Sequence, residues 1–132
     1  MNFLDTNIIL RFVLQDHPIY SPKANFILDK INQGEDVYTS WLVIFETIFV
    51  LLHTHKLNKA EITEKLLPLL CFETLHIENK SLVKKTFGYF VQKNVSFADA
   101  YSVALMEKKK LKKIYSFDRD FDKIPQIKRL EK

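Results

Sequence analysis

The stretch Phe3-Leu4-Asp5-Thr6-Asn7-Ile8-Ile9-Leu10-Arg11 joins a predicted strand to a predicted helix, which differ in the spacing of their apolar residues. Residues 2–5 are predicted to form a short strand, and the apolar residues over 8–13 recur with the spacing of one helix face. Thr6 and Asn7 are residue types that cap a helix N-terminus. The chain therefore begins with a strand that leads almost directly into a helix, and Asp5 stands at the junction.

The same alternation continues along the chain. A second helix is predicted to open near Pro22 and to stop at Gly34. Further helices are predicted over about 41–54, 58–70, 79–92 and 97–106, and further strands over 37–39, 73–77, 114–117 and 127–130. Ser40 and Ser96 are the expected caps, and Pro68 predicts a break or kink late in its helix. This alternation predicts an α/β fold, with a parallel sheet and helices on both faces.

Composition sets outer bounds on the protein. A length of 132 residues with 47% apolar and 27% charged residues is typical of one globular domain. Met1 is followed directly by the predicted first strand, which leaves no room for a signal peptide. The longest apolar run, 41–52, is too short for a membrane span, so we expect a cytoplasmic protein. The single cysteine, Cys71, lies in an apolar run and is expected to be buried.

Four acidic residues are the main indication of function: Asp5, Glu46, Asp99 and Asp118. Each lies at the end of an apolar run or inside one, where a lone carboxylate is costly unless something compensates its charge. Ligands bind beyond the carboxyl ends of parallel strands, and hard divalent cations take oxygen ligands. The four acids are therefore predicted to form a metal site if the order of the strands brings them together.

Each acid also has a simpler explanation. Asp99 fits a capping box that starts at Ser96. Asp118 could cap the turn that follows it, and Asp5 could cap the first helix. Glu46 shares its helix face with apolar residues and could form a structural salt bridge, with Arg11 as one candidate partner. A single site accounts for all four acids together.

Phosphoryl transfer is the chemistry that uses such a site. Bound Mg²⁺ or Mn²⁺ lowers the pKa of an attacking water and neutralises charge that develops on a phosphodiester. Without metal, close carboxylates repel one another and some are expected to be protonated near neutral pH. Metal binding is therefore expected to stabilise the fold.

Four segments in this order resemble those of PIN-domain ribonucleases, specifically the VapC-like toxins of prokaryotic toxin–antitoxin pairs. They are 3–11, Ser40 followed by Glu46, 97–100, and 116–125. The resemblance runs from Met1 to about Leu130. It implies a single PIN-like domain over 1–132, with a three-layer α/β/α arrangement around a central parallel sheet. Ser116 stands where a Thr is frequent in the family, a change that keeps the hydroxyl.

The resemblance also implies an activity and partners. The activity is endonucleolytic cleavage of RNA that depends on one or two Mg²⁺ or Mn²⁺ ions. The implied catalytic and metal-binding residues are Asp5, Glu46, Asp99 and Asp118, with Thr6, Asn7, Ser116 and Asp120 as supporting polar groups. The implied partners are a small cognate antitoxin and a second copy of the chain in a homodimer.

The sequence leaves two alternative functions to compare. A non-catalytic PIN-like module would bind RNA or a protein, and its RNA binding would survive loss of metal and of Asp99. A phosphoacceptor receiver domain needs neighbouring acids near the first strand and an Asp at the end of a central strand. Asp5 is instead followed by Thr6 and Asn7, and the strand over 37–39 ends without an acid. The receiver function is therefore disfavoured.

The net charge of +4 and the pI near 9.1 favour an anionic partner. Five lysines lie within 108–113, where they would complement a helix C-terminus or contact phosphates. Candidate contacts to RNA or antitoxin are Arg11, Lys109, Lys110, Lys112 and Arg119.

Combined substitution of Lys109, Lys110 and Lys112 tests the phosphate-contact role of this run. If these lysines contact phosphates, fewer counterions are released on binding, and the salt dependence of RNA affinity becomes flatter. RNA binding titrations at several salt concentrations measure this slope. An unchanged slope would leave the run with a capping role alone.

Overall fold

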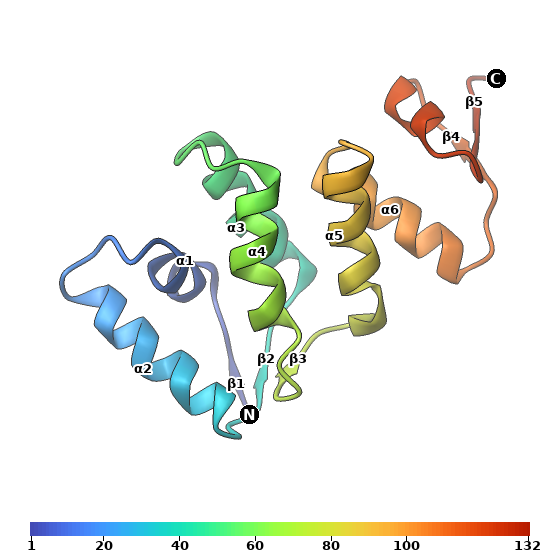
Figure 1. The fold of residues 1–132 in the computed structure, drawn as a ribbon. Coiled ribbons are helices and arrows are strands. Elements are labelled where there is room, and N and C mark those ends of the chain that lie inside the picture. Colours follow the sequence, from blue (N-terminus) through green and yellow to red (C-terminus); the bar gives the residue numbers. More distant parts are fainter. The chain divides into compact units, whose positions relative to one another are not determined.

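The computed structural model describes residues 1–132, which form two compact units, Met1–Lys80 and Ser81–Lys132 (Figure 1). The first unit contains β1 (Asn2–Phe3), α1 (Thr6–Leu14), α2 (Tyr20–Asn32), β2 (Val37–Tyr38), α3 (Trp41–His53), α4 (Lys59–Leu70) and β3 (Leu75–His76). A short 3-10 helix, η1 (Lys80–Leu82), stands at the boundary. The second unit contains α5 (Val83–Gln92), α6 (Phe97–Lys108), β4 (Lys113–Tyr115), the 3-10 helix η2 (Arg119–Lys123) and β5 (Lys128–Leu130).

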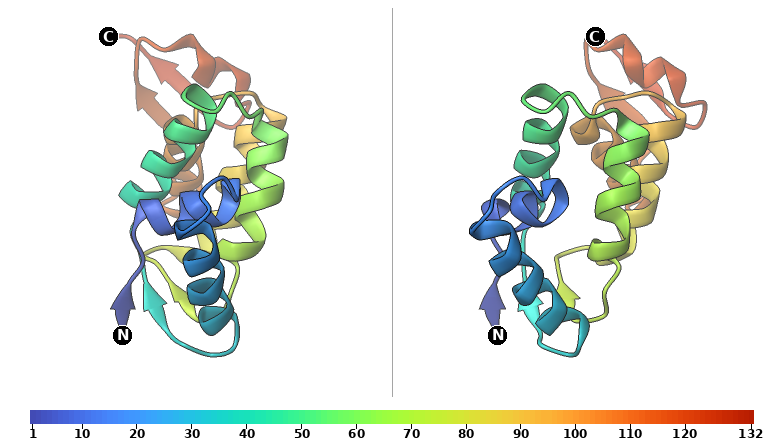
Figure 2. Two further views of the ribbon diagram at one scale, coloured as in Figure 1. Left: turned by 90° about the vertical axis from the view of Figure 1, so that its left-hand side faces the viewer. Right: turned by 60° about the vertical axis from the view of Figure 1, so that its left-hand side comes forward.

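The three strands of the first unit are parallel and lie in the order β1-β2-β3 (Figure 2). Pairing continues just beyond the strands, because the Leu4 N–H donates to the Tyr38 carbonyl at 2.8 Å and the Thr39 N–H to the His76 carbonyl at 2.9 Å. The carboxyl ends of β1 and β2 therefore lie at the same edge of the sheet. Asp5 follows one of these ends and Ser40 follows the other.

A buried threonine connects these two strand ends. Thr39 is fully buried, and its Oγ1 donates a hydrogen bond to the Leu4 carbonyl at 2.8 Å. Ser40, the next residue, accepts a hydrogen bond from the Val43 N–H at 3.2 Å and caps α3. The start of α3 is thereby held beside the residue that precedes Asp5.

The helices of the first unit supply its core. α1 packs against α2 and α3, and α3 packs against α4. Their inward faces bury large aliphatic residues almost completely, among them Ile9, Leu28, Ile44, Leu51, Ile62 and Leu66. Full burial of such a side chain contributes about 1.5–3 kcal/mol before conformational entropy is counted. Because the strands are only two residues long, this helix packing provides most of the stabilisation.

The second unit has its own cores. Phe97 at the start of α6 meets Phe87 and Phe90 of α5 edge to face, with ring centroids 4.9 and 5.3 Å apart. β4 and β5 form a parallel pair with Lys113 opposite Lys128. A second apolar group joins α6 to η2 and the residues before β5, and consists of Val103, Met106, Phe121, Ile124 and Ile127.

Most sequence predictions of elements are confirmed. The chain is α/β with parallel strands, and Ser40 and Ser96 cap α3 and α6 as predicted. The strands are shorter than predicted. The helix that contains Pro68 continues for two more residues, to Leu70, so the proline lies in its last turn.

The prediction that Cys71 is buried is wrong. Cys71 is exposed because it is the C-cap of α4, beyond the last residue of the helix face that faces the core. No helix in the structure is long and apolar enough to cross a membrane, as predicted from the run over 41–52.

Thr39→Val tests the link between β1 and β2. The substitution keeps the shape of the side chain but leaves the Leu4 carbonyl without its hydroxyl donor, and we expect a loss of about 1–3 kcal/mol in the free energy of unfolding. Urea denaturation of the full chain measures it. Thr63→Val is the control, because Thr63 donates only within its own helix, to Lys59, and should change stability by less than about 0.5 kcal/mol. Equal effects of the two variants would contradict this role of Thr39.

Candidate active site

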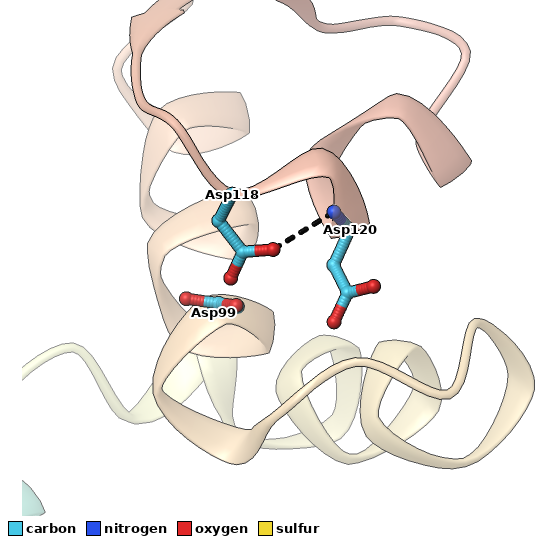
Figure 3. A group of neighbouring side chains, drawn as sticks. All are labelled: Asp99, Asp118 and Asp120. Atoms are coloured by element: carbon cyan, nitrogen blue, oxygen red, sulfur yellow. Dashed lines mark hydrogen bonds between the residues drawn. The ribbon is translucent and has the colours of Figure 1, made fainter.

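Three carboxylates gather in the second unit, and we call them the acidic cluster (Figure 3). One oxygen each from Asp99, Asp118 and Asp120 lies within 4.8 Å of the other two. Asp99 projects from the first turn of α6, Asp118 precedes η2, and Asp120 lies within η2. Figure 3 shows the Asp118 carboxyl facing that of Asp99.

A helix cap positions Asp99. Ser96 Oγ accepts a hydrogen bond from the Asp99 N–H at 3.1 Å, as the predicted capping role of Ser96 requires. The simpler explanation of Asp99 as part of a capping box therefore describes its backbone correctly. Its carboxyl also belongs to the acidic cluster, so the two roles coexist.

A tight turn positions Asp118. Its Oδ1 accepts a hydrogen bond from the Asp120 N–H at 2.9 Å, which confirms that Asp118 caps the short helix after it. Ser116 Oγ in turn accepts from the Asp118 N–H at 3.0 Å. Two side-chain bonds therefore order the backbone on both sides of Asp118.

The environment of the acidic cluster disfavours full ionisation. Burial raises the pKa of Asp99 above its ordinary value, and the adjacent carboxyl of Asp118 raises it further through hydrogen bonding and charge repulsion. A hydrogen bond with Ser96 acts in the opposite direction, and the charge of Asp120 adds a smaller increase. Lys123 offsets part of the negative charge, because its Nζ lies 3.2 Å from Asp120 Oδ1.

The first unit holds the other two predicted catalytic acids. Glu46 is exposed on α3, and one of its carboxylate oxygens accepts a hydrogen bond from Thr6 Oγ1 at 3.1 Å. Thr6 is itself buried in the first turn of α1. Asp5 is exposed at the N-cap position of α1, but its side chain makes no capping hydrogen bond. The simpler explanation of Asp5 as a side-chain cap is therefore wrong.

Arg11 does not pair with Glu46. Its Nη1 lies 3.0 Å from Asp16 Oδ1 in the loop after α1, so the alternative of an Arg11–Glu46 salt bridge is wrong. Asn7 is exposed beside it. A depression of about 490 Å³ between α1 and α2 is lined by Asn7, Ile8, Arg11, Tyr20, Lys23 and Ile27.

The predicted site residues thus fall into two groups. The structure brings Asp99 and Asp118 together with Asp120 in the second unit, and it brings Glu46 into contact with Thr6 in the first. Asp5 lies in the first unit as well, and its side chain makes no capping hydrogen bond.

The basic candidates are exposed. Lys109, Lys110 and Lys112 follow the C-terminal end of α6, where Lys110 has the left-handed backbone that ends the helix. The lysine run therefore lies where it complements the helix dipole. Arg119 is exposed at the start of η2. Contact of these residues with RNA or antitoxin stays a prediction.

The sequence did not predict the roles of two cations near the acidic cluster. Lys123 pairs with Asp120, and its only sequence signal is its position three residues after that acid. Arg129 pairs with Asp122, and its pKa is raised by hydrogen bonds to Asp122 and then to Glu131. Arg129 lies in β5 among residues of no obvious pattern, so no local signal marks it.

The acidic cluster fits a divalent cation in ligand type and in charge. All three donors are carboxylate oxygens, the hard ligands that Mg²⁺ and Mn²⁺ favour. The raised pKa of Asp99 reflects burial first, and then the neighbouring carboxyls of Asp118 and Asp120. A bound cation would relieve both the repulsion and the cost of burial.

Comparison with known proteins gives the family. The PIN domain family matches residues 3–127. The chain belongs to the PIN domain family. This membership confirms the resemblance seen in the sequence and the predicted α/β fold class.

Two individual proteins are similar to this PIN domain. A VapC ribonuclease from Aquifex aeolicus (strain VF5) is 24% identical over 124 residues, which are 94% of this chain and 92% of that protein. The crystal structure of Mycobacterium tuberculosis VapC20, described as a sarcin-ricin loop cleaving toxin, aligns with a TM-score of 0.42 and 23% sequence identity. That alignment covers 92% of this chain and 93% of the other.

Asp99→Asn tests the electrostatics of the acidic cluster in this PIN domain. The folded-state pKa of Asp99 is raised, so the stability that this carboxyl contributes is fully present below its unfolded-state pKa of about 3.9. It is lost as pH rises through the folded-state pKa. At neutral pH the metal-free variant should therefore be more stable than wild type, by no more than about 1 kcal/mol because water screens a half-buried group.

Thermal melts from acid to neutral pH, with and without Mn²⁺, measure both effects. The advantage of the variant should grow with pH, and Mn²⁺ should raise the Tm of wild type more than that of Asp99→Asn. Glu64→Gln, an exposed change on α4, is the control for loss of one negative charge. A metal-free variant that is less stable than wild type at neutral pH would contradict the repulsion.

Proposed function

We propose that this PIN domain is a metal-dependent endoribonuclease that cleaves RNA phosphodiester bonds and acts as the toxin of a toxin–antitoxin pair. The observation that carries the proposal is the acidic cluster, three carboxylates within 4.8 Å, in a chain matched to the PIN domain family over 3–127. The likeness to a VapC ribonuclease along 94% of the chain supports RNA as the substrate.

Four acids are proposed to carry out catalysis and bind metal: Asp5, Glu46, Asp99 and Asp118. The first two belong to one compact unit and the last two to the other. The family match extends across both units, which supports the proposal that 1–132 is one PIN domain. Asp120 joins them as a supporting acid through its place in the acidic cluster.

The polar neighbours fix how these carboxylates are presented. The Thr6 hydroxyl donates to one oxygen of Glu46, which restricts the rotation of a long and exposed side chain. The Asp120 N–H occupies Oδ1 of Asp118, which leaves the other oxygen of that carboxyl turned toward Asp99. Lys123 holds Oδ1 of Asp120. Glu46, Asp118 and Asp120 are thus oriented before any ligand arrives, as a preorganised site requires.

The proposed cofactor is Mg²⁺ or Mn²⁺, one or two ions. Asp99 and Asp118 would hold it in the second unit, with Asp120 beside them. When bound, such an ion supplies charge neutralisation at the phosphodiester and a lower pKa for the attacking water. An ionised Asp99 is the form that binds metal, so its raised pKa predicts weaker binding in mild acid than at neutral pH.

The proposed partners follow from the same family likeness. They are RNA, a small antitoxin and a second copy of the chain. Arg11, which lines the depression between α1 and α2, is a candidate for contact with RNA or antitoxin. Arg119 and the exposed lysines after α6 are further candidates. The cytoplasm, where RNA and antitoxin are both present, is the proposed location.

Cleavage of a total RNA pool tests the proposal. Wild type should produce discrete fragments with Mg²⁺ or Mn²⁺ and none with EDTA. Asp99→Asn and Asp5→Asn should each lower the cleavage rate by at least about 100-fold, because each removes a carboxylate proposed to hold the ion that neutralises charge at the phosphodiester. Mapping the fragment ends by sequencing would give the target.

Asp29→Asn is the matched control, since it is the same change at an exposed position on α2. It should cleave as wild type does. If folded wild type binds RNA but cuts none with either metal, the non-catalytic binding module replaces the nuclease. If Asp99→Asn abolishes cleavage and Asp5→Asn does not, the proposal that Asp5 is a catalytic acid is wrong.

A further inference from the structure

Arg129 of β5 contacts both ends of the segment 116–122, which carries two acids of the acidic cluster. Its Nε and Nη2 bind the two carboxylate oxygens of Asp122 at 3.0 and 3.3 Å. Its Nη1 donates to the Ser116 carbonyl at 3.1 Å and also to Glu131. One guanidinium therefore joins the first and last residues of a seven-residue segment.

The segment between these contacts has few other long-range constraints. The Ser116 N–H donates to the Leu130 carbonyl at 3.0 Å, and Phe121 is buried in the second core. Two side-chain bonds are local, from the Asp118 N–H to Ser116 and from the Asp120 N–H to Asp118. Asp120 also pairs with Lys123, whose Nζ donates to the Asn94 carbonyl at 3.1 Å. The bonds within the segment order the turn, but none of them joins its first residue to its last. Arg129 supplies that link, because one guanidinium bonds to both Ser116 and Asp122.

The contact is well suited to a guanidinium. The Arg129 side chain is only 11% exposed although its partner Asp122 is 53% exposed, so the arginine is the buried half of the pair. Its planar fork can bind a carboxylate with two bonds and still donate to a carbonyl, whereas a lysine ammonium is a point charge on a flexible stem. Lysine at this position would keep the charge and lose the geometry.

We infer that Arg129 is a positioning residue for the acidic cluster: by holding Ser116 and Asp122 together, it fixes the turn that presents Asp118 and Asp120 to Asp99. The inference builds on the proposed function, in which these acids bind metal. Arg129 itself contacts neither metal nor substrate. Its role is to set the spacing of the carboxylates, as outer partners of metal ligands commonly do.

Arg129→Lys in the full chain tests the inference in two ways. The first readout is amide hydrogen exchange without metal: the N–H groups of Asp118 and Asp120 should exchange faster, by about tenfold, because the turn opens more often. The Asp99 N–H, which bonds to Ser96 outside the segment, should be unchanged. The second readout is the Kd for Mn²⁺ by calorimetry, which should rise about 10- to 100-fold.

Two further variants separate positioning from charge and from folding. Lys128→Ala removes a positive charge from the neighbouring exposed residue of β5 and should leave both readouts unchanged. Asp122→Asn leaves Arg129 in place but weakens the paired contact, so it should shift both readouts in the same direction by less. It also serves if Arg129→Lys does not fold. Saturating Mn²⁺ should restore RNA cleavage by the folded variants.

The outcomes distinguish this inference from the proposed function. If Asp118 and Asp120 exchange as slowly in Arg129→Lys and Asp122→Asn as in wild type, Arg129 does not order the turn and the inference is wrong. A lower Tm with unchanged exchange at these two amides and an unchanged Mn²⁺ Kd would give Arg129 a structural role only, which also overturns it. If wild type neither binds Mn²⁺ nor cuts RNA, the proposed function fails, while the exchange data still decide whether Arg129 holds the turn.

Discussion

Repulsion among the carboxylates of the acidic cluster is the constraint on which the second unit depends. Three negative groups within 4.8 Å, one of them half-buried with a raised pKa, would separate if their backbones were free to move. Local bonds from Ser96 and Ser116 hold two of these backbones, and Lys123 offsets part of the charge. Ordinary capping interactions thus hold the three carboxyls in an arrangement that is electrostatically unfavourable without a ligand.

The strands of both units are very short, so other contacts stabilise the fold. With two or three residues each, β1 to β5 supply alignment, while the stabilisation comes from helix faces and from a few side chains that bond to backbone. Thr39 is the clearest example in the first unit, since its hydroxyl secures the carbonyl that precedes Asp5. Part of the candidate site, Asp5 after β1 and Ser116 after β4, therefore follows strand ends, which is where parallel sheets place ligands.

Local chemistry was predictable from the sequence, and long-range pairing was not. Ser40 and Ser96 were identified as caps because a cap and its N–H partner are three residues apart. Arg11 is one predicted salt-bridge partner of Glu46, but in the structure it pairs with Asp16, five residues further along the chain. Cys71 is predicted to be buried because its neighbours are apolar, yet it is exposed at the C-cap of α4. Periodicity gives residue types and faces, whereas the partner of a charged side chain depends on tertiary geometry.

The contact of Arg129 with Ser116 has a consequence for biosynthesis. A ribosome makes the chain from its N-terminus, so Asp99 and Asp118 leave the exit tunnel before the residue that fixes the turn between 116 and 122. A nascent chain that ends before β5 contains Asp99 and Asp118 but lacks the Arg129 contacts that hold the turn. For a protein proposed to cut RNA, β5 would then act as a timing element, which delays assembly of the acidic cluster until Arg129 has been translated.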